Sequence, residues 1–196
     1  MAGEFSANIS LSYGVNSVFQ LTFSGTAIGP RIDTIDTDTG AGWSLNINGE
    51  GFSAVKGKVM IGKKSAKILS WEDSHIRFAL PKLNAGQYEL SLSTIAKIKA
   101  TTSAQLNVHV PKLSSVNKNV VLAKTSLVLT GEYFGEDKPT VYLISDKFKK
   151  SAKVLSDYSD TTLQIVVPQL KAGSYKVVVK SNAGSSFDEI YVNVGP

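Results

Sequence analysis

The sequence predicts an all-β protein in which two similar domains follow a short β-hairpin. The first observation is a phrase that occurs twice, as "PKLNAGQYEL" from Pro81 and as "PQLKAGSYKV" from Pro168, because internal similarity at a fixed distance indicates copied structural units. The second is a series of short alternating apolar runs separated by glycine, asparagine, aspartate and proline, which is typical of β-sandwiches. The third is that no stretch has the apolar periodicity of a capped helix.

Residues 1–29 precede both copies and predict the hairpin. In "NSVFQLTFSGTAIG" the side chains of Phe19, Leu21 and Phe23 alternate toward one face, which we expect to point inward, and a Gly-Thr turn follows at Gly25. The opening "MAGEFS" has the character of an expression tag, and the remainder resembles the closing strands of a preceding β domain. Because an isolated hairpin is marginally stable, we expect it to dock on the first domain, to pair with another chain or to stay loose.

Further matched motifs extend the repeat over the rest of the chain. "PRI" from Pro30 matches "PKL" from Pro111, "SLNINGEGF" from Ser44 matches "SLVLTGEYF" from Ser126, and "SAKILS" from Ser65 matches "SAKVLS" from Ser151. The motifs keep their order, and matched positions lie 81 to 87 residues apart, which indicates small insertions between preserved strands. We therefore expect two homologous domains, residues 30–110 and residues 111–196.

Each domain is predicted to be a sandwich of about seven strands. In "HIRFAL" the residues Ile76, Phe78 and Leu80 fall on one face of a strand, and His75 and Arg77 fall on the other. The run "LQIVV" has the same pattern in the second domain. Both patterns predict strands with one buried face.

The repeated phrase has a local structural explanation. A Leu is followed by a Gly three residues later and by a Tyr two residues after that, a spacing that resembles the tyrosine corner of immunoglobulin-like sandwiches. In such a corner the tyrosine hydroxyl bonds back to the backbone where the chain crosses between the sheets. We expect Tyr88 and Tyr175 to be structural, with Gly86 and Gly173 supplying the unusual backbone dihedrals.

The combined motifs resemble the IPT/TIG family of immunoglobulin-like domains. The pattern consists of a Pro with an apolar pair, a Gly-rich turn, "L-x-I/L-x-G-x-x-F", "S-A-K" and "P-x-L-x-A-G-x-Y", and it covers residues 30–110 and 111–194. The resemblance implies an immunoglobulin-like sandwich for each copy. Domains of this family serve as carbohydrate-associated modules of bacterial surface proteins and extracellular amylolytic enzymes, as receptor ectodomain segments and as dimerising domains of transcription factors. A shared fold leaves the choice among these functions open.

Composition and charge exclude several classes of function. The net charge of +5 arises almost entirely from lysine, with 10 basic against 7 acidic residues in 30–110 and 11 against 8 in 111–196. This even spread indicates a charge that favours solubility rather than a focused nucleic-acid patch. The chain has no cysteine, so disulfides and thiolate chemistry are excluded. Its longest apolar runs are far shorter than the roughly 20 residues of a membrane helix.

Candidate chemical sites are few. Asp33, Asp36 and Asp38 in "DTIDTDTG" have the alternation of a calcium loop, but Ile47 stands where a helix-flanked loop needs its bidentate Glu. An ordinary Asp/Gly turn is therefore expected. The two histidines, at positions 75 and 109, have no companion ligands in the sequence for zinc or for a catalytic triad. The sequence predicts no enzyme, no cofactor and no metal.

Trp43 and Trp71 are the candidate ligand-binding residues, because exposed aromatic rings can hold sugar rings. Tyr158 occupies the region of the second copy that corresponds to Trp71, so we expect Trp71 to cover the end of a core. Trp43 has no aromatic counterpart and is the stronger glycan candidate. The lysines of "SDKFKK" at positions 147, 149 and 150 could contact phosphates, although a solvated loop is expected there.

These observations favour a non-enzymatic spacer or recognition module of a bacterial extracellular or cell-surface protein, of which this chain is a fragment. Its expected partner is a protein or a glycan at the cell surface. The alternative is a carbohydrate-binding accessory module of a polysaccharide-degrading system. A DNA-binding transcription factor segment is a weaker third hypothesis, because base-edge readout depends largely on arginine and the chain has only Arg31 and Arg77.

Overall fold

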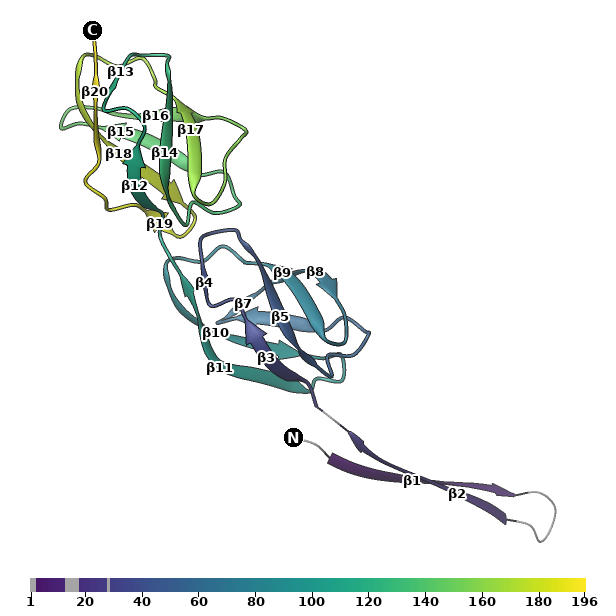
Figure 1. Cartoon of the computed structure of the whole chain (residues 1–196). Coiled ribbons are helices and arrows are strands. Elements are labelled where there is room, and N and C mark those ends of the chain that lie inside the picture. Colours follow the sequence, from purple (N-terminus) through teal and green to yellow (C-terminus); the bar gives the residue numbers. More distant parts are fainter. Residues whose placement is uncertain (1–2, 13–17, 28) are drawn as a thin grey trace.

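The computed structural model describes residues 3–12, 18–27 and 29–196. Within these residues every regular element is a β-strand, which confirms the predicted all-β class. Figure 1 shows a two-stranded hairpin followed by two sandwiches placed end to end, with the C-terminus at the far end of the second. We call residues 30–110 domain 1 and residues 111–196 domain 2. The described part of the chain contains no helix long and apolar enough to cross a membrane.

The hairpin is present, but its turn is not where the sequence pattern put it. Strand β1 (Gly3–Ser12) pairs antiparallel with β2 (Val18–Ala27) along the whole length of both strands. The Gly-Thr pair that was expected to turn lies inside β2, where Gly25 stands opposite Phe5. The prediction was wrong because the partner strand precedes β2, so the chain continues extended through Gly25 toward domain 1.

The inward face expected for the hairpin is not formed at Leu21, whose side chain is 44% exposed. The side chains of Phe19 and Phe23 lie outside the described residues. As described, β1 and β2 form a sheet of their own with no third strand, and Figure 1 shows them extending away from domain 1. A single two-stranded layer has no second sheet against which to bury a face.

Domain 1 is a sandwich of two sheets. The first has the order β3-β5-β9-β8 and the second has the order β4-β11-β10-β6-β7. Their bounds are β3 Arg31–Ile35, β4 Asp38–Thr39, β5 Ser44–Glu50, β6 Lys58–Ile61, β7 Lys64–Ser65, β8 Lys67–Trp71, β9 His75–Ala79, β10 Gly86–Ser93 and β11 Lys99–Val108. Neighbouring strands are antiparallel except β4, which runs parallel to β11.

Domain 2 repeats this plan with local changes. Its bounds are β12 Lys112–Val116, β13 Val120–Val121, β14 Ser126–Glu132, β15 Thr140–Ile144, β16 Lys149–Val154, β17 Thr162–Val166, β18 Gly173–Ser181, β19 Gly184–Ser185 and β20 Tyr191–Val194. Strand β16 pairs with β15 at one end and with β17 at the other. It replaces the separate β7 and β8 of domain 1 and joins both sheets into one sheet of nine strands, with the order β12-β14-β17-β16-β15-β18-β20-β13 and β19 paired to β18 beside this path. The long β11 of domain 1 corresponds to the two shorter strands β19 and β20, which both pair with β18.

Each domain has its own apolar core, built from the alternation seen in the sequence. In β9 and just beyond it, Ile76, Phe78 and Leu80 are buried, and Arg77 between them is exposed. In domain 2, Leu163 and Ile165 are fully buried in the same way. The period-two patterns therefore identify the core-facing sides of these strands correctly.

The "G-E-x-F" motif of each copy fixes the first strand against the core. A Cβ atom on Gly49 would lie 2.0 Å from the carbonyl oxygen of Arg31, and one on Gly131 would lie 2.0 Å from that of Lys112. The phenylalanine three residues later reaches under the same glycine. Only a residue without a side chain allows this close approach of two backbones.

Candidate functional site

The two predicted corner tyrosines make the hydrogen bond that defines a tyrosine corner. The hydroxyl of Tyr88 donates to the carbonyl of Asn84 at 3.0 Å, and that of Tyr175 donates to the carbonyl of Lys171 at 3.0 Å. The glycines two residues before them, at positions 86 and 173, have φ angles of 150° and 157°. The corners differ in one respect: Tyr88 is half-exposed, whereas Tyr175 is 3% exposed.

The three aspartates of the candidate calcium loop point to different partners. Asp33 pairs with Arg31, and the carboxylate of Asp36 accepts a hydrogen bond from the backbone N–H of Asn46. Asp38 faces the end of β11. Within the described ranges, no group of three or more acidic or imidazole side chains is gathered closely enough to hold a metal ion.

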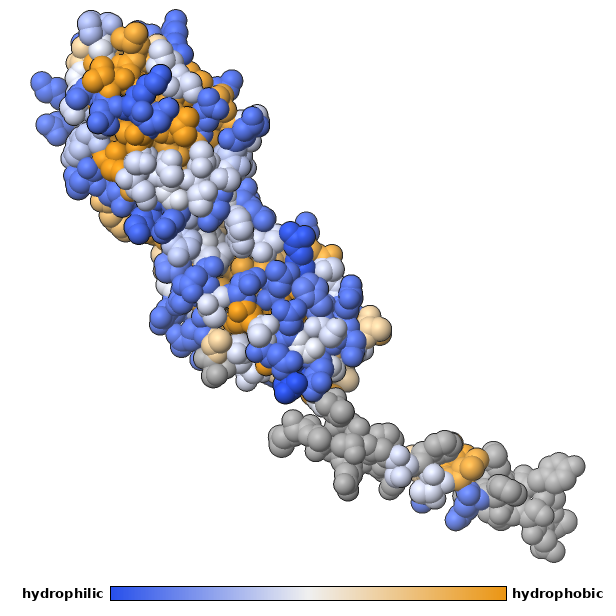
Figure 2. Space-filling view, in the orientation of Figure 1, coloured by the Kyte–Doolittle hydropathy of each residue, from blue (hydrophilic) through white to orange (hydrophobic). Residues whose placement is uncertain are grey.

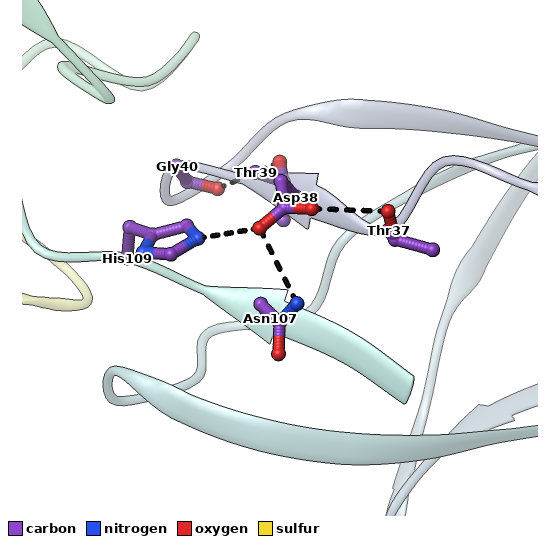
Figure 3. Close-up of polar contacts among 6 residues, drawn as sticks. All are labelled: Thr37, Asp38, Thr39, Gly40, Asn107 and His109. Atoms are coloured by element: carbon purple, nitrogen blue, oxygen red, sulfur yellow. Dashed lines mark hydrogen bonds and ion pairs between the residues drawn. The ribbon is translucent and has the colours of Figure 1, made fainter. Parts of the chain in front are cut away.

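Asp38 is held by a polar cluster on the short parallel pair β4 and β11 (Figure 3). Its carboxylate accepts hydrogen bonds from His109 at 2.8 Å, Thr37 at 3.0 Å and Asn107 at 3.3 Å. The pKa of Asp38 lies below its ordinary value, chiefly because of the bonds from His109 and Thr37. A lowered pKa in the folded state means that these contacts stabilise the protein above the ordinary aspartate pKa, and that this stabilisation is lost as the pH falls through the lowered value.

The ring face of His109 connects this cluster to domain 2. Its ring stacks on the ring of Tyr133, with centroids 4.3 Å apart and an interplanar angle of 21°. Tyr133 has a positive φ of 60°, a strained conformation for a residue with a large side chain. Together with Asp38, these contacts point to a structural role for His109 at the end of domain 1 rather than a catalytic one.

Direct bonds cross the boundary between the domains at further points. The backbone N–H of Ala85 donates to the carbonyl of Ala183 at 2.9 Å. The hydroxyl of Ser44 donates to the carboxylate of Glu136 at 2.9 Å. Ala183, in the turn between β18 and β19 of domain 2, is buried and packs within the core cluster of domain 1. The two sandwiches are therefore docked on each other, and Pro111 between them is buried.

Close backbone contacts leave little space at this junction. A Cβ atom on Gly40 would lie 2.9 Å from the carbonyl oxygen of Tyr133, and one on Gly135 would lie 2.1 Å from that of Ala41. Gly135 also has a φ of 88°. At the boundary, turns that contain glycine bring the backbones of the two domains into close contact.

Neither tryptophan lies on the surface as an open ring, because both pack against the core of domain 1. Trp71 packs edge-on against Phe52, with ring centroids 6.5 Å apart, and its indole N–H donates to the carbonyl of Ser53 at 2.9 Å. In domain 2, Tyr158 likewise donates to a loop carbonyl, that of Glu136, at 3.1 Å. Trp43 is also partly buried against the domain 1 core. The structure does not bring the two tryptophans into contact as one site.

Among the side chains that the structure describes, the most exposed aromatics are not residues predicted from the sequence. Phe187 is 79% exposed, and Phe148 and Tyr191 are each 49% exposed. Figure 2 shows apolar residues reaching the surface of both sandwiches between hydrophilic ones, most extensively on domain 2. All three aromatics belong to domain 2, and Phe148 lines a groove rich in lysine.

The Phe148 groove is a hollow of about 320 Å³ beside the turn between β15 and β16. It is lined by Phe148, Lys149, Lys150, Gln169, Leu170, Lys171 and Tyr175. This volume falls within the roughly 300–1,000 Å³ of small-molecule sites. A signal for it existed in the sequence: the matched turn of domain 1 is shorter and has Gly62 in place of Phe148.

A second hollow of about 210 Å³ lies at the domain boundary, lined by residues that include His109, Tyr133, Phe187 and Asp188. The carboxylate of Asp188 is already occupied there, because it accepts a hydrogen bond from the backbone N–H of Leu113 at 2.6 Å. This hollow belongs to the docked junction rather than to a separate recognition surface.

An exposed charge cluster lies near the end of domain 2. Glu189 accepts hydrogen bonds from the ammonium of Lys176 and from the hydroxyl of Tyr191. The bond with Glu189 raises the pKa of Lys176, and the bond from Lys176 is the main cause of the lowered pKa of Glu189. The same carboxylate raises the pKa of Tyr191. Because the cluster is exposed to solvent, it contributes little to stability.

Comparison with known proteins identifies a family and relatives that match all or part of the tandem. The IPT/TIG domain profile matches residues 30–110 and 111–192. A cyclomaltodextrin glucanotransferase of Bacillus sp. (strain 1-1) is 28% identical over 186 residues, which cover 90% of this chain and 26% of that protein. The corresponding protein of Thermoanaerobacterium thermosulfurigenes is 31% identical over 100 residues, or 50% of this chain and 14% of that protein.

A similar fold occurs in a solved structure, the full extracellular region of plexin A4. It has a TM-score of 0.52 at 15% identity and covers 85% of this chain and 18% of that chain, which shows a shared fold. This chain therefore spans about a quarter or less of the length of each of these three proteins.

Proposed function

This chain belongs to the IPT/TIG domain family, and from that membership we propose that it is a non-catalytic spacer and recognition module of a larger extracellular or cell-surface protein. The observation that carries the proposal is the docked junction. Domains joined in one chain usually move relative to each other unless their interface is well packed. Here the Ala85–Ala183 and Ser44–Glu136 bonds, with the buried side chain of Ala183, favour one fixed orientation. A rigid tandem can hold a neighbouring domain at a set distance.

Small-angle scattering of the purified chain tests the spacer role. We expect an elongated particle with a radius of gyration clearly above the roughly 16 Å of a single compact domain of this length. Val110 and Pro111 connect the sandwiches directly, and proline restricts the residue before it to extended conformations. A radius near the compact value, or a profile typical of two independently moving bodies, would contradict the proposal.

A second candidate function is a carbohydrate-binding accessory module. It is favoured by the similarity that extends over 90% of this chain to a cyclomaltodextrin glucanotransferase, a protein whose name describes the transfer of glucan. Among the residues singled out in the sequence, Trp43 is the better ligand candidate, because the indole N–H of Trp71 is already bonded within domain 1. A partly exposed indole can offer its apolar face to a sugar ring.

A glycan array tests this second function with the wild type, Trp43→Ala and Trp43→Phe. We expect glucan binding to be lost in the alanine variant and largely kept in the phenylalanine variant, because a ring remains. Thermal unfolding serves as the control, since Trp43 also packs on the core. No binding by the wild type would exclude the function, and tight DNA binding with a steep salt dependence would favour a nucleic-acid module instead.

A further inference from the structure

The turn between β15 and β16 departs from the repeat that the rest of the chain follows. In domain 1 the matched strands β6 and β7 are joined by the two residues Gly62 and Lys63. In domain 2 the connection has four residues, from Ser145 to Phe148. The fold of domain 1 forms without these extra residues, so folding alone does not require them.

The longer turn is well ordered by its own backbone. The N–H of Ser145 donates to the carbonyl of Phe148 at 2.8 Å, and the N–H of Phe148 donates back to the carbonyl of Ser145 at 3.3 Å. This closed turn holds Phe148 next to the corner tyrosine of domain 2, with 49% of the side chain still exposed. Tyr175 belongs to the buried core of domain 2, whereas its counterpart Tyr88 is only partly buried. Such preorganisation lowers the entropy cost of binding a ligand.

The Phe148 groove is also strongly basic. Lys149, Lys150 and Lys171 line it, and an adjoining hollow of about 260 Å³ shares Phe148 and Lys171 with it and adds Lys147. Asp146 is the one acidic residue among the residues that line the two hollows. Four lysines against one aspartate create a local positive field at a partly apolar surface.

Two of these lysines are positioned by the fold. The ammonium of Lys149 lies 4.3 Å from the centroid of the Tyr142 ring, and that of Lys150 donates to the carbonyl of Gln169 at 3.2 Å. Among the described residues, neither Lys147 nor Lys171 forms an ion pair with a carboxylate. Their charges are therefore available to a ligand.

We propose that the Phe148 groove of domain 2, together with its adjoining hollow, binds an acidic polysaccharide, with one sugar ring against Phe148 and its carboxylate or sulfate groups on Lys171 and on Lys147 of the hollow. A sugar ring has an apolar C–H face that packs on an aromatic side chain, and its charged substituents lie at the rim, where lysine can reach them. Lysine meets such groups as a point charge, whereas base-edge readout in nucleic acids relies on the fork of arginine. Both arginines of the chain, at positions 31 and 77, belong to domain 1.

This inference rests on the second candidate function only in taking a polysaccharide as the ligand, and it is independent of the spacer role.

Titration calorimetry on the full chain should compare oligogalacturonate with a neutral maltooligosaccharide of the same length. We expect saturable binding of the acidic sugar that weakens as salt is added, because added ions screen exposed charges. Phe148→Ala and the pair Lys147→Gln with Lys171→Gln should each weaken this binding about 10-fold.

Matched controls separate the groove from the general surface. Phe187→Ala removes a more exposed aromatic of the same domain, and the pair Lys118→Gln with Lys180→Gln removes the same charge elsewhere on it. Both controls should bind within about twofold of the wild type. Circular dichroism melts of every variant establish that the fold is retained.

The outcomes distinguish this proposal from the others. Absence of acidic-sugar binding, or binding that the groove variants and the controls reduce equally, would overturn it. Equal affinity for a single-stranded DNA of the same charge would also overturn it, because a general polyanion site would then explain the result. Neutral glucan binding that depends on Trp43 and not on Phe148 would keep the carbohydrate function and refute this site.

Discussion

Phe134→Ala should lower the free energy of unfolding of domain 2 by about 3–5 kcal/mol. Phe134 is fully buried, and its ring lies under the backbone of Gly131, where an added Cβ would come within 2.7 Å of it. Its backbone N–H also donates to the carbonyl of Asp160 at 3.0 Å, so the surrounding chain is fixed and cannot easily collapse into the cavity. A loss of this size is a large fraction of the stability of a small domain.

The chain offers a convenient way to measure the two domains separately. Both tryptophans, Trp43 and Trp71, lie in domain 1, so tryptophan fluorescence in a urea titration follows domain 1, whereas circular dichroism follows both domains. Phe134→Ala should produce an early dichroism transition with little fluorescence change. The matched variant Phe52→Ala, which removes the equivalent fully buried ring of domain 1, should shift the fluorescence transition instead.

Some coupling between the two transitions is expected. Ala183 packs on the core of domain 1 from domain 2, so unfolding of domain 2 uncovers part of that core. The fluorescence midpoint of Phe134→Ala should therefore fall slightly, by much less than the dichroism midpoint. A change below about 1 kcal/mol in domain 2 would mean that the site relaxes around the missing ring and that the motif has been misjudged.

Much of the fold could be predicted because its determinants are local. The side-chain period of two in β9 and β17 identifies the buried face without any knowledge of the partner strands. The repetition of the motifs adds the order of the strands, because two copies with one order indicate one plan. The prediction of a turn at Gly25 was wrong because it used the local signal alone. Glycine permits a turn, but the pairing of β2 with the preceding strand β1 keeps the chain extended there.

The junction between the domains could not be predicted from local patterns. Its contacts join Ala85 to Ala183 and Ser44 to Glu136 across about 100 residues of chain, and small or polar turn residues carry no signal for what they will face. The histidine at position 109 is isolated in the sequence, and its partners become visible only when β4 and domain 2 are in place.

Exposure explains why the structure adds Phe148 to the ligand candidates that the sequence offers. Tryptophan is the residue type from which a sugar platform is most readily predicted, yet Trp43 and Trp71 both pack against the domain 1 core. Phe148 and Phe187 are of the same residue type as the core phenylalanines, but the fold leaves them exposed. Residue type alone cannot separate these cases, since a large aromatic ring stabilises a core and a binding surface by the same burial.

Gly135→Ala should separate the two sandwiches while leaving each one folded. The new Cβ would lie 2.1 Å from the carbonyl oxygen of Ala41, and a backbone atom in a buried turn cannot move aside. The φ of 88° at this position adds strain for any L-residue, of order 1–3 kcal/mol. Relief requires the domain 1 turn and the domain 2 turn to move apart, which breaks the nearby Ser44–Glu136 contact.

Residual dipolar couplings measured by NMR would detect this separation, because two rigidly docked domains share one alignment tensor and two uncoupled domains do not. We expect one shared tensor for the wild type and for Gly195→Ala, whose added Cβ would lie 3.1 Å from a side-chain carbon of Leu122 and 3.8 Å, an ordinary contact distance, from the carbonyl oxygen of Val121. Gly135→Ala should give two tensors.

Ala183→Asp provides an independent route to the same result, because it places a charge where domain 2 packs on the core of domain 1 and a buried unpaired charge is costly. It leaves the backbone dihedrals of the turn at Gly135 unchanged, so strain within domain 2 cannot account for its effect. If both variants kept the shared tensor of the wild type, the fixed junction would be refuted, and the spacer function would lose the observation on which it depends.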